Sequence, residues 1–150
     1  MSAMAANPLP PPPQNADRAA RESYFRAHAA GIYDRLTEGR RRFLRADELC
    51  RRAAAEFPGL LPSDAELAVE SPRLQKDKQG AEITQGLFLS AVLGDPVAGM
   101  HLCHASLLPL PASQARLGEF QRAGALDLGG ARVERQGKAA VVTMQNPPGA

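Results

Sequence analysis

The sequence contains no tryptophan and just two cysteines, and aromatic residues make up 5% of its 150 residues. Cys50 and Cys103 are far apart and follow no metal-binding pattern, so we expect two buried thiols and no disulfide. There is no run of about 18 apolar residues, which excludes a transmembrane helix. Residues 1–13 have neither the basic nor the apolar region of a signal peptide. We therefore expect a cytoplasmic protein with no membrane partner.

A large excess of charge of one sign is also lacking, because the formal net charge is +2. Domains that bind nucleic acid are usually strongly basic, so no nucleic-acid partner is expected. One segment is nevertheless rich in arginine: Arg40, Arg41, Arg42, Arg45, Arg51 and Arg52. These side chains could contact a phosphate group. Asp47 and Glu48 lie four residues before the last two arginines, in the order that favours ion pairs on a helix, so a solvated and paired helix face is favoured.

The motifs of several enzyme classes are absent. The sequence has no glycine-rich nucleotide loop, no Gly-x-Ser-x-Gly elbow and no His-Glu-x-x-His zinc motif. His101 and His104 share a helix face near Cys103, so two imidazoles could meet one metal ion. No second cluster of ligands exists and the flanking residues are apolar, which favours a core or interface role and no metal site.

The remaining ionisable residues form no constellation. His28 lies on an apolar helix, where a hydrogen-bonding partner is favoured over catalysis. Glu66, Glu70 and Glu82 are scattered acids without a visible partner. No catalytic residue can therefore be named from motifs.

Apolar periodicity predicts several helices after a proline-rich tail at residues 1–14, which we expect to be disordered. The first helix begins after an N-cap at Asn15 or Asp17. Its apolar stripe consists of Phe25, Ala29, Ile32 and Leu36. The second helix ends at Pro58, and its stripe consists of Phe43, Ala46, Cys50, Ala53 and Phe57.

Capping patterns predict the later helices. Ser63 and Glu66 fit a capping box, and Ser71-Pro72 fits an N-cap followed by proline at the first helical position. A buried helix is expected at 81–93, and an amphipathic one at 113–122 with Leu117 and Phe120 inward. Between them, Asp95-Pro96 begins a helix whose stripe would be Val97, Met100 or His101, His104 and Leu108.

The period changes after Gly129-Gly130. A strand at 132–135, a turn at Gln136-Gly137 and a strand at 138–144 form a hairpin whose second strand is apolar on both faces. A lone hairpin is marginal in water, so we expect further strands that this chain does not contain. The expected organisation is a tail at 1–14, a helical domain at 15–128 and a truncated domain at 129–150.

The segment 132–148 resembles the opening of the crotonase (enoyl-CoA hydratase/isomerase) superfamily. Its members start with a strand, a glycine turn and an apolar strand that ends in Val-x-x-Asn-Arg-Pro. Here Val142 to Pro148 fits that ending, with Pro147 where arginine is usual. The fold class implied is mainly α: a helical N-terminal extension followed by the first β-hairpin of a truncated crotonase-like α/β domain.

The helical extension narrows the resemblance. Residues 84–89, 101–105 and 107–111 are similar to the cofactor-independent dioxygenases of that superfamily, which act on a dihydroxyphenylacetyl-CoA thioester in the biosynthesis of glycopeptide antibiotics. The resemblance implies O₂ as co-substrate, CoA as part of the substrate, no metal or organic cofactor, and a homo-oligomer. It also implies catalytic residues downstream of Ala150, so that Gly149 and Ala150 would lie in a loop beside the bound CoA.

Two other interpretations remain open from the sequence. The first is another crotonase-type hydratase, isomerase or thioesterase with an unusual helical extension. The second is a non-catalytic helical interaction module, in which the hairpin offers an edge to a partner.

Overall fold

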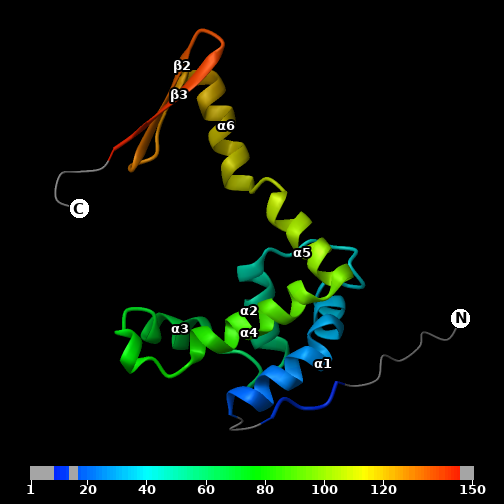
Figure 1. Cartoon of the computed structure of the whole chain (residues 1–150). Coiled ribbons are helices and arrows are strands. Elements are labelled where there is room, and N and C mark those ends of the chain that lie inside the picture. The colour runs from blue at the N-terminus through cyan, green and yellow to red at the C-terminus, as the bar shows by residue number, and fades with distance from the viewer. Residues whose placement is uncertain (1–8, 14–16, 146–150) are drawn as a thin grey trace, which may run out of the picture. The chain divides into compact units, whose positions relative to one another are not determined.

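The computed structural model describes residues 9–13 and 17–145, and it is mainly helical with a three-stranded antiparallel sheet (Figure 1). This confirms the predicted order of a helical segment followed by a hairpin. The elements are α1 (Arg18–Leu36), α2 (Ala46–Glu56), α3 (Asp64–Glu70), the 3₁₀ turn η1 (Gln75–Asp77), α4 (Ala81–Gly94), α5 (Pro96–Leu107), α6 (Pro111–Ala123), β1 (Ala125–Asp127), β2 (Ala131–Gln136) and β3 (Ala139–Met144).

The chain divides into two compact units, residues 1–107 (unit 1) and 108–150 (unit 2). The structure thus groups α6 with the sheet, whereas the sequence placed the boundary at residues 128–129. Of the predicted tail, residues 9–13 are described. Leu9 packs against the core of unit 1, and the hydroxyl of Tyr24 donates to the carbonyl of Pro10 at 2.7 Å, so this part of the tail is held by contacts.

α1 forms as the sequence predicts. The Asp17 side chain accepts a hydrogen bond from the backbone N–H of Ala20 at 2.9 Å, which satisfies one of the free donors of the first turn. All four members of the predicted stripe are buried: Phe25, Ala29, Ile32 and Leu36. The helix ends at Thr37, and Gly39 follows in the left-handed region at φ 67°. Glycine adopts this conformation without the steric cost of a Cβ.

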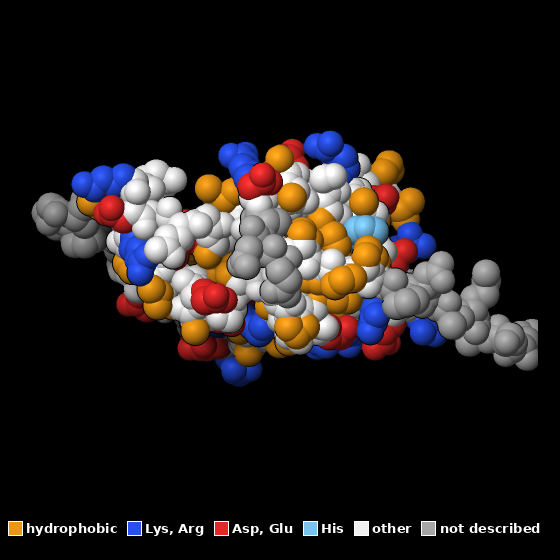
Figure 2. Space-filling view, turned by 90° about the horizontal axis from the view of Figure 1, so that it is seen from below, with side chains coloured by type: hydrophobic (Ala, Val, Ile, Leu, Met, Phe, Trp, Pro, Cys, Tyr) orange, Lys and Arg blue, Asp and Glu red, His pale blue; other side chains and the backbone are white. Residues whose placement is uncertain are grey.

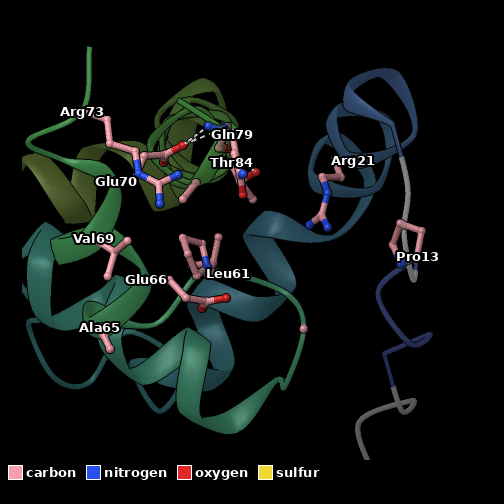
Figure 3. A pocket seen from close by; sticks show the side chains of 14 residues that line it. Pro13, Arg21, Leu61, Ala65, Glu66, Val69, Glu70, Arg73, Gln79 and Thr84 are labelled. Atoms are coloured by element: carbon pink, nitrogen blue, oxygen red, sulfur yellow. Dashed lines mark hydrogen bonds between the residues drawn. The ribbon is translucent and has the colours of Figure 1, made fainter. Parts of the chain in front are cut away.

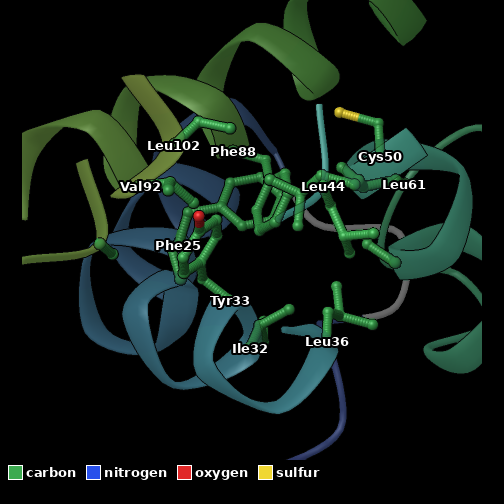
Figure 4. Packing of buried hydrophobic residues seen from close by; sticks show 14 of the residues in the cluster. Phe25, Ile32, Tyr33, Leu36, Leu44, Cys50, Leu61, Phe88, Val92 and Leu102 are labelled. Carbon is green, nitrogen blue, oxygen red and sulfur yellow. The ribbon is translucent and has the colours of Figure 1, made fainter. Parts of the chain in front are cut away.

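The core of unit 1 lies between α1, α2, α4 and α5 (Figure 4). Phe25 and Phe88 occupy its centre, with their ring centroids 5.7 Å apart. Leu49 from α2 and Val92 from α4 are fully buried in the same cluster. Burying each such side chain contributes about 1.5–3 kcal/mol, so these residues explain why the helices pack together.

Three sequence predictions about unit 1 are wrong. No helix begins at Pro72: turns follow α3 until η1, and α4 begins after Gly80. Phe43 lies outside α2 and is 45% exposed, because α2 begins at Ala46. The arginines at 40–42 accordingly lie in a turn and not on a helix face.

The inner face of α5 also differs from the prediction. Its buried residues are Ala98, Gly99, Leu102 and Ala105, whereas Val97, Met100 and His104 of the expected stripe are exposed. The small side chains let α5 approach α4 closely. A Cβ on Gly99 would lie 2.6 Å from the carbonyl oxygen of Leu93.

Replacing Gly99 by alanine is expected to destabilise unit 1 by about 1–3 kcal/mol, because the added methyl group meets backbone that cannot rotate away. Gly86→Ala is the matched control, since a Cβ there meets nothing within 4 Å. A helical glycine replaced by alanine without strain gains about 0.4–1 kcal/mol. Urea unfolding followed by circular dichroism measures both changes, and effects of the same sign would contradict the close approach of α5.

In unit 2, the sheet has the order β1-β2-β3, and both neighbouring pairs are antiparallel. The predicted hairpin is present, with Val133 opposite Val142 and a turn at Gly137. The sequence missed β1, which pairs with β2. Leu117, expected to face inward, is 55% exposed, whereas Phe120 is half-buried and lies under the guanidinium of Arg135 at 5.6 Å. α6 ends at Gly124 as predicted.

Two surface properties follow from this fold. Basic and acidic side chains are interspersed around hydrophobic ones on the face shown in Figure 2. No single described helix is long and apolar enough to cross a membrane. The segments Ala81–Gly94 and Pro96–Ala123, which meet at a bend of 110°, are together long and apolar enough to cross a membrane. This is weak evidence, because the core helices of soluble proteins meet the same criterion.

Candidate functional site

A cavity of about 830 Å³ lies between α1, α3 and the start of α4 (Figure 3). Arg21 reaches it from α1, Val69 and Glu70 from α3, and Gly80 and Thr84 from the start of α4. The size suits a small organic ligand. What such a cavity could do depends on the groups that are still available to a ligand.

Glu70 is buried and already engaged. Its carboxylate accepts hydrogen bonds from the backbone N–H groups of Gln79, of Gly80 at 2.7 Å and of Glu82 at 2.9 Å. Burial alone would raise the pKa of the Glu70 carboxyl. The backbone donors outweigh burial and hold this pKa below its usual range. Glu70 therefore caps α4 from another helix and is not a general base.

Replacing Glu70 by alanine is expected to lower the melting temperature by several degrees at neutral pH, because buried backbone donors would lose their acceptor. Because folding lowers the pKa of Glu70, its ionised carboxylate stabilises the fold at pH values above the unfolded pKa of 4.5. This stabilisation is lost as the pH falls through the lower pKa of the folded state. Below pH 4.5 the wild type should therefore lose stability more steeply than Glu70→Gln. Parallel pH curves of the melting temperature would contradict this role.

The two other acids also have structural partners. Glu66 completes the predicted capping box, since its backbone N–H donates to the Ser63 hydroxyl at 3.2 Å and its carboxylate accepts from the Ser63 backbone at 2.7 Å. Glu82 pairs with Lys78 at 2.5 Å. All three glutamates are thus used in caps and ion pairs, and only the partner of Glu66 was predicted from the sequence.

His101 bridges two segments of unit 1. Its Nε2 lies 3.0 Å from the carbonyl oxygen of Arg40 and must donate to it, so Nδ1 is left as the acceptor for the Tyr33 hydroxyl at 2.5 Å. Burial, with the negative charge of Asp34, raises the pKa of Tyr33 to about 12. The ring of Phe43 stacks on both imidazoles, at 4.5 Å from His101 and 5.0 Å from His104. These contacts support the predicted core or interface role of the histidines.

No group of three or more His, Cys, Asp or Glu side chains within residues 9–13 and 17–145 is placed to hold a metal ion. His28 lies against Tyr24, with ring centroids 4.7 Å apart. Cys50 is buried, and burial raises the pKa of its thiol to about 11. Cys103, in contrast, is exposed, so the prediction of two buried thiols is wrong for this residue.

The arginine-rich segment is paired internally. Glu48 accepts from both Arg51 and Arg52 at 2.7 Å, and the hydrogen bond from Arg52 is the main reason that the pKa of Glu48 is lowered. Arg51 also pairs with Asp64 at 3.0 Å, a partner that helical spacing could not show. In the preceding turn, Arg42 donates to the Leu36 carbonyl at 2.8 Å. These contacts confirm that the arginine side chains are paired. Asp47 was the expected partner of Arg51, but the ion pairs of Arg51 in the described residues are with Glu48 and Asp64.

The residues predicted to lie beside CoA, Gly149 and Ala150, fall outside the described residues. Among the described side chains, Glu66 and Glu70 of the cavity serve as helix caps, and His101 outside it bridges Tyr33 and Arg40. The cavity is thus suited to binding and not to acid–base chemistry.

The chain is similar in sequence to a known enzyme. No protein-family model matches it. The chain is 47% identical over 127 residues to a (3,5-dihydroxyphenyl)acetyl-CoA 1,2-dioxygenase of Amycolatopsis orientalis. The match covers 85% of this chain and 29% of the relative, so the chain spans less than a third of that enzyme's length. The predicted resemblance to a dioxygenase of this kind is confirmed at the level of sequence.

Proposed function

We propose that this chain is the N-terminal portion of an enzyme that converts 3,5-dihydroxyphenylacetyl-CoA and O₂ to 3,5-dihydroxyphenylglyoxylate and CoA. The observation that carries the proposal is the 47% identity to a dioxygenase of that substrate over most of this chain. The strand, glycine turn and strand at residues 131–144 support a crotonase-like continuation.

The proposed reaction needs no electron acceptor besides O₂. A base removes a proton from the carbon between the ring and the thioester, and backbone N–H groups stabilise the enolate oxygen. The enolate reduces O₂ and forms a C–O bond, which gives a peroxide on that carbon. The distal peroxide oxygen attacks the thioester carbon and expels CoA. O–O cleavage with loss of the second proton leaves the keto acid, so both oxygen atoms enter the product.

In such an enzyme this chain would contact CoA and help to cover the active-site pocket. A pocket that holds an enolate must exclude water, and the helices of unit 1 would form part of its wall or of the oligomer. Gly149 and Ala150 would contact CoA through the backbone, because small residues permit close approach. The base and the oxyanion donors would come from beyond Ala150.

An oxygen electrode and a thiol reagent test the proposal on the enzyme that contains this chain. With 3,5-dihydroxyphenylacetyl-CoA and a chelator present, O₂ consumption and CoA release should proceed in equal amounts. An enzyme that hydrates a crotonyl thioester and ignores the dihydroxyphenyl one would refute the dioxygenase and leave the general crotonase interpretation. Loss of activity with the chelator would refute cofactor independence.

One observation favours the alternative of a helical interaction module: unit 1 has a core of its own, built on Phe25, Leu49 and Phe88. A module should be soluble and monodisperse at this length, and the enzyme that contains it should show no thioester chemistry. The same oxygen and thiol assay therefore separates the two proposals.

A further inference from the structure

The cavity between α1, α3 and the start of α4 contains two arginines whose side chains have no partner within residues 9–13 and 17–107. They are Arg21 and Arg73, and both line the cavity. Apart from Arg18, every other arginine in this part of the chain is held by a carboxylate or by a backbone carbonyl. The fold thus pairs most of its arginines and leaves two guanidinium groups available in the cavity wall.

The two guanidinium groups come from different segments and are directed toward the space between them (Figure 3). Arg21 belongs to α1 and is half-buried, whereas Arg73 lies in the turn after α3 and is exposed. A guanidinium is charged at any physiological pH, and its fixed N–H donors match the two oxygens of a carboxylate. The cavity therefore offers cationic donors to an anion.

The acids of the same cavity narrow the kind of anion. Glu70 accepts from the backbone N–H groups of Gly80 and Glu82, and Glu66 accepts from that of Ser63. Glu70 thereby occupies the donors at the start of α4, which would otherwise suit a phosphate group. The two negative charges also repel a dianion more strongly than a monoanion. These contacts favour a singly charged carboxylate over a phosphate.

Apolar side chains complete the cavity wall. Leu61, Ala65 and Val69 line it, and Val69 is 59% exposed although its side chain is a hydrocarbon. Ligand pockets commonly combine such an apolar wall with a few polar groups that fix the orientation of the ligand. At about 830 Å³ the cavity has room for an aromatic ring or a short hydrocarbon chain beside the bound charge.

We propose that this cavity binds a small organic acid, with its carboxylate bound by Arg21 and Arg73 and its apolar part against Val69. The site is separate from the loop expected to contact CoA, and the proposal does not depend on the dioxygenase reaction. A failure of either proposal therefore leaves the other standing.

Phenylacetate and its uncharged amide, phenylacetamide, test the charge requirement on the 150-residue chain. The two molecules share the ring and nearly the same shape, so a difference in calorimetric dissociation constant reports on the carboxylate. Phenylacetate should bind about 10-fold more tightly or better, because hydrogen bonds to charged groups are the stronger ones. In amide NMR spectra it should shift the signals of Gly80 and Thr84, which line the cavity, and leave that of Gly137 in unit 2 unchanged.

Substitution of the arginines tests the site itself. Arg21→Gln and Arg73→Gln should each weaken phenylacetate binding by about 5-fold or more, the loss expected for one charge-assisted hydrogen bond, and should leave phenylacetamide binding unchanged. Arg18→Gln is the matched control, because Arg18 is an exposed arginine of the same helix outside the cavity. It should leave both dissociation constants unchanged. Circular dichroism of each variant shows whether the helices are kept.

Several outcomes would overturn the proposal. Equal dissociation constants for the acid and the amide would show a merely apolar pocket, and tighter binding of inorganic phosphate would show the wrong class of anion. Absence of phenylacetate binding at millimolar concentration, or binding that leaves the signals of Gly80 and Thr84 unchanged, would remove the site. Because the comparison of acid and amide uses the wild-type chain, it remains informative if an arginine variant does not fold.

Discussion

Phe88→Ala is expected to destabilise unit 1 by about 3–5 kcal/mol, the range for removal of a buried aromatic ring. Phe88 is fully buried and lies against Phe25 from α1, so the cavity left behind would open between the two helices that frame the core (Figure 4). Other residues of the same core, such as Val92 and Leu49, are themselves fully buried and cannot fill the space.

Urea unfolding at one fixed protein concentration measures this change, since self-association would otherwise alter the apparent stability. Val69→Ala is a suitable control, because Val69 is 59% exposed and its truncation should change stability by no more than about 0.5 kcal/mol. A loss below about 1 kcal/mol for Phe88→Ala would mean that the helices do not pack as described.

The 150-residue chain alone is expected to show no turnover of 3,5-dihydroxyphenylacetyl-CoA, whereas the enzyme that contains it should release CoA and consume O₂. The reason is chemical: an enolate needs a positioned base and oxyanion donors. Glu70 and Glu66 are occupied as caps, and His101 is held between Tyr33 and Arg40. Removal of the remainder should thus abolish the reaction entirely and not merely slow it.

Free thiol released over several hours, with and without added metal ions, checks this expectation. The enzyme at the same concentration is the positive control, and boiled enzyme sets the background. Turnover by the short chain above that background would place a catalytic site within these residues, and the region around His101 and His104 would be the first to examine.

Local patterns in the sequence predicted the elements that local physics determines. The stripe of α1 could be predicted because Phe25, Ala29, Ile32 and Leu36 follow at intervals of four, three and four residues. The capping box at Ser63 and Glu66 depends on residues three apart. The turn at Gly137 could be predicted because a glycine there separates a short strand that contains Val133 from the apolar run of β3.

Packing preferences could not be read in the same way. Every side of α5 is apolar, so periodicity gave no reason to choose the small face over the face with Met100 and Leu107. β1 has three residues, Ala125–Asp127, too few for an alternating pattern, and it is defined by its pairing with β2. Pro72 fitted a helix start, but turns continue from there to η1.

The candidate site was the least predictable part. Glu70 appeared as an isolated acid because its partners are backbone N–H groups, which leave no trace in the residue types of a sequence. The cavity beside it is built by segments from α1, α3 and α4 that no motif connects. Residue types alone give no signal for this cap, because Glu70 lies ten residues before Gly80.

The cap made by Glu70 also bears on the order of folding. Its acceptor atoms bind amides that are 9, 10 and 12 residues further along the chain, so the loop that closes is short and the entropy lost in closing it is small. The contact between Tyr33 and His101, by comparison, spans 68 residues. The contact between α3 and the start of α4 can therefore form early in folding, before α1 packs against α5.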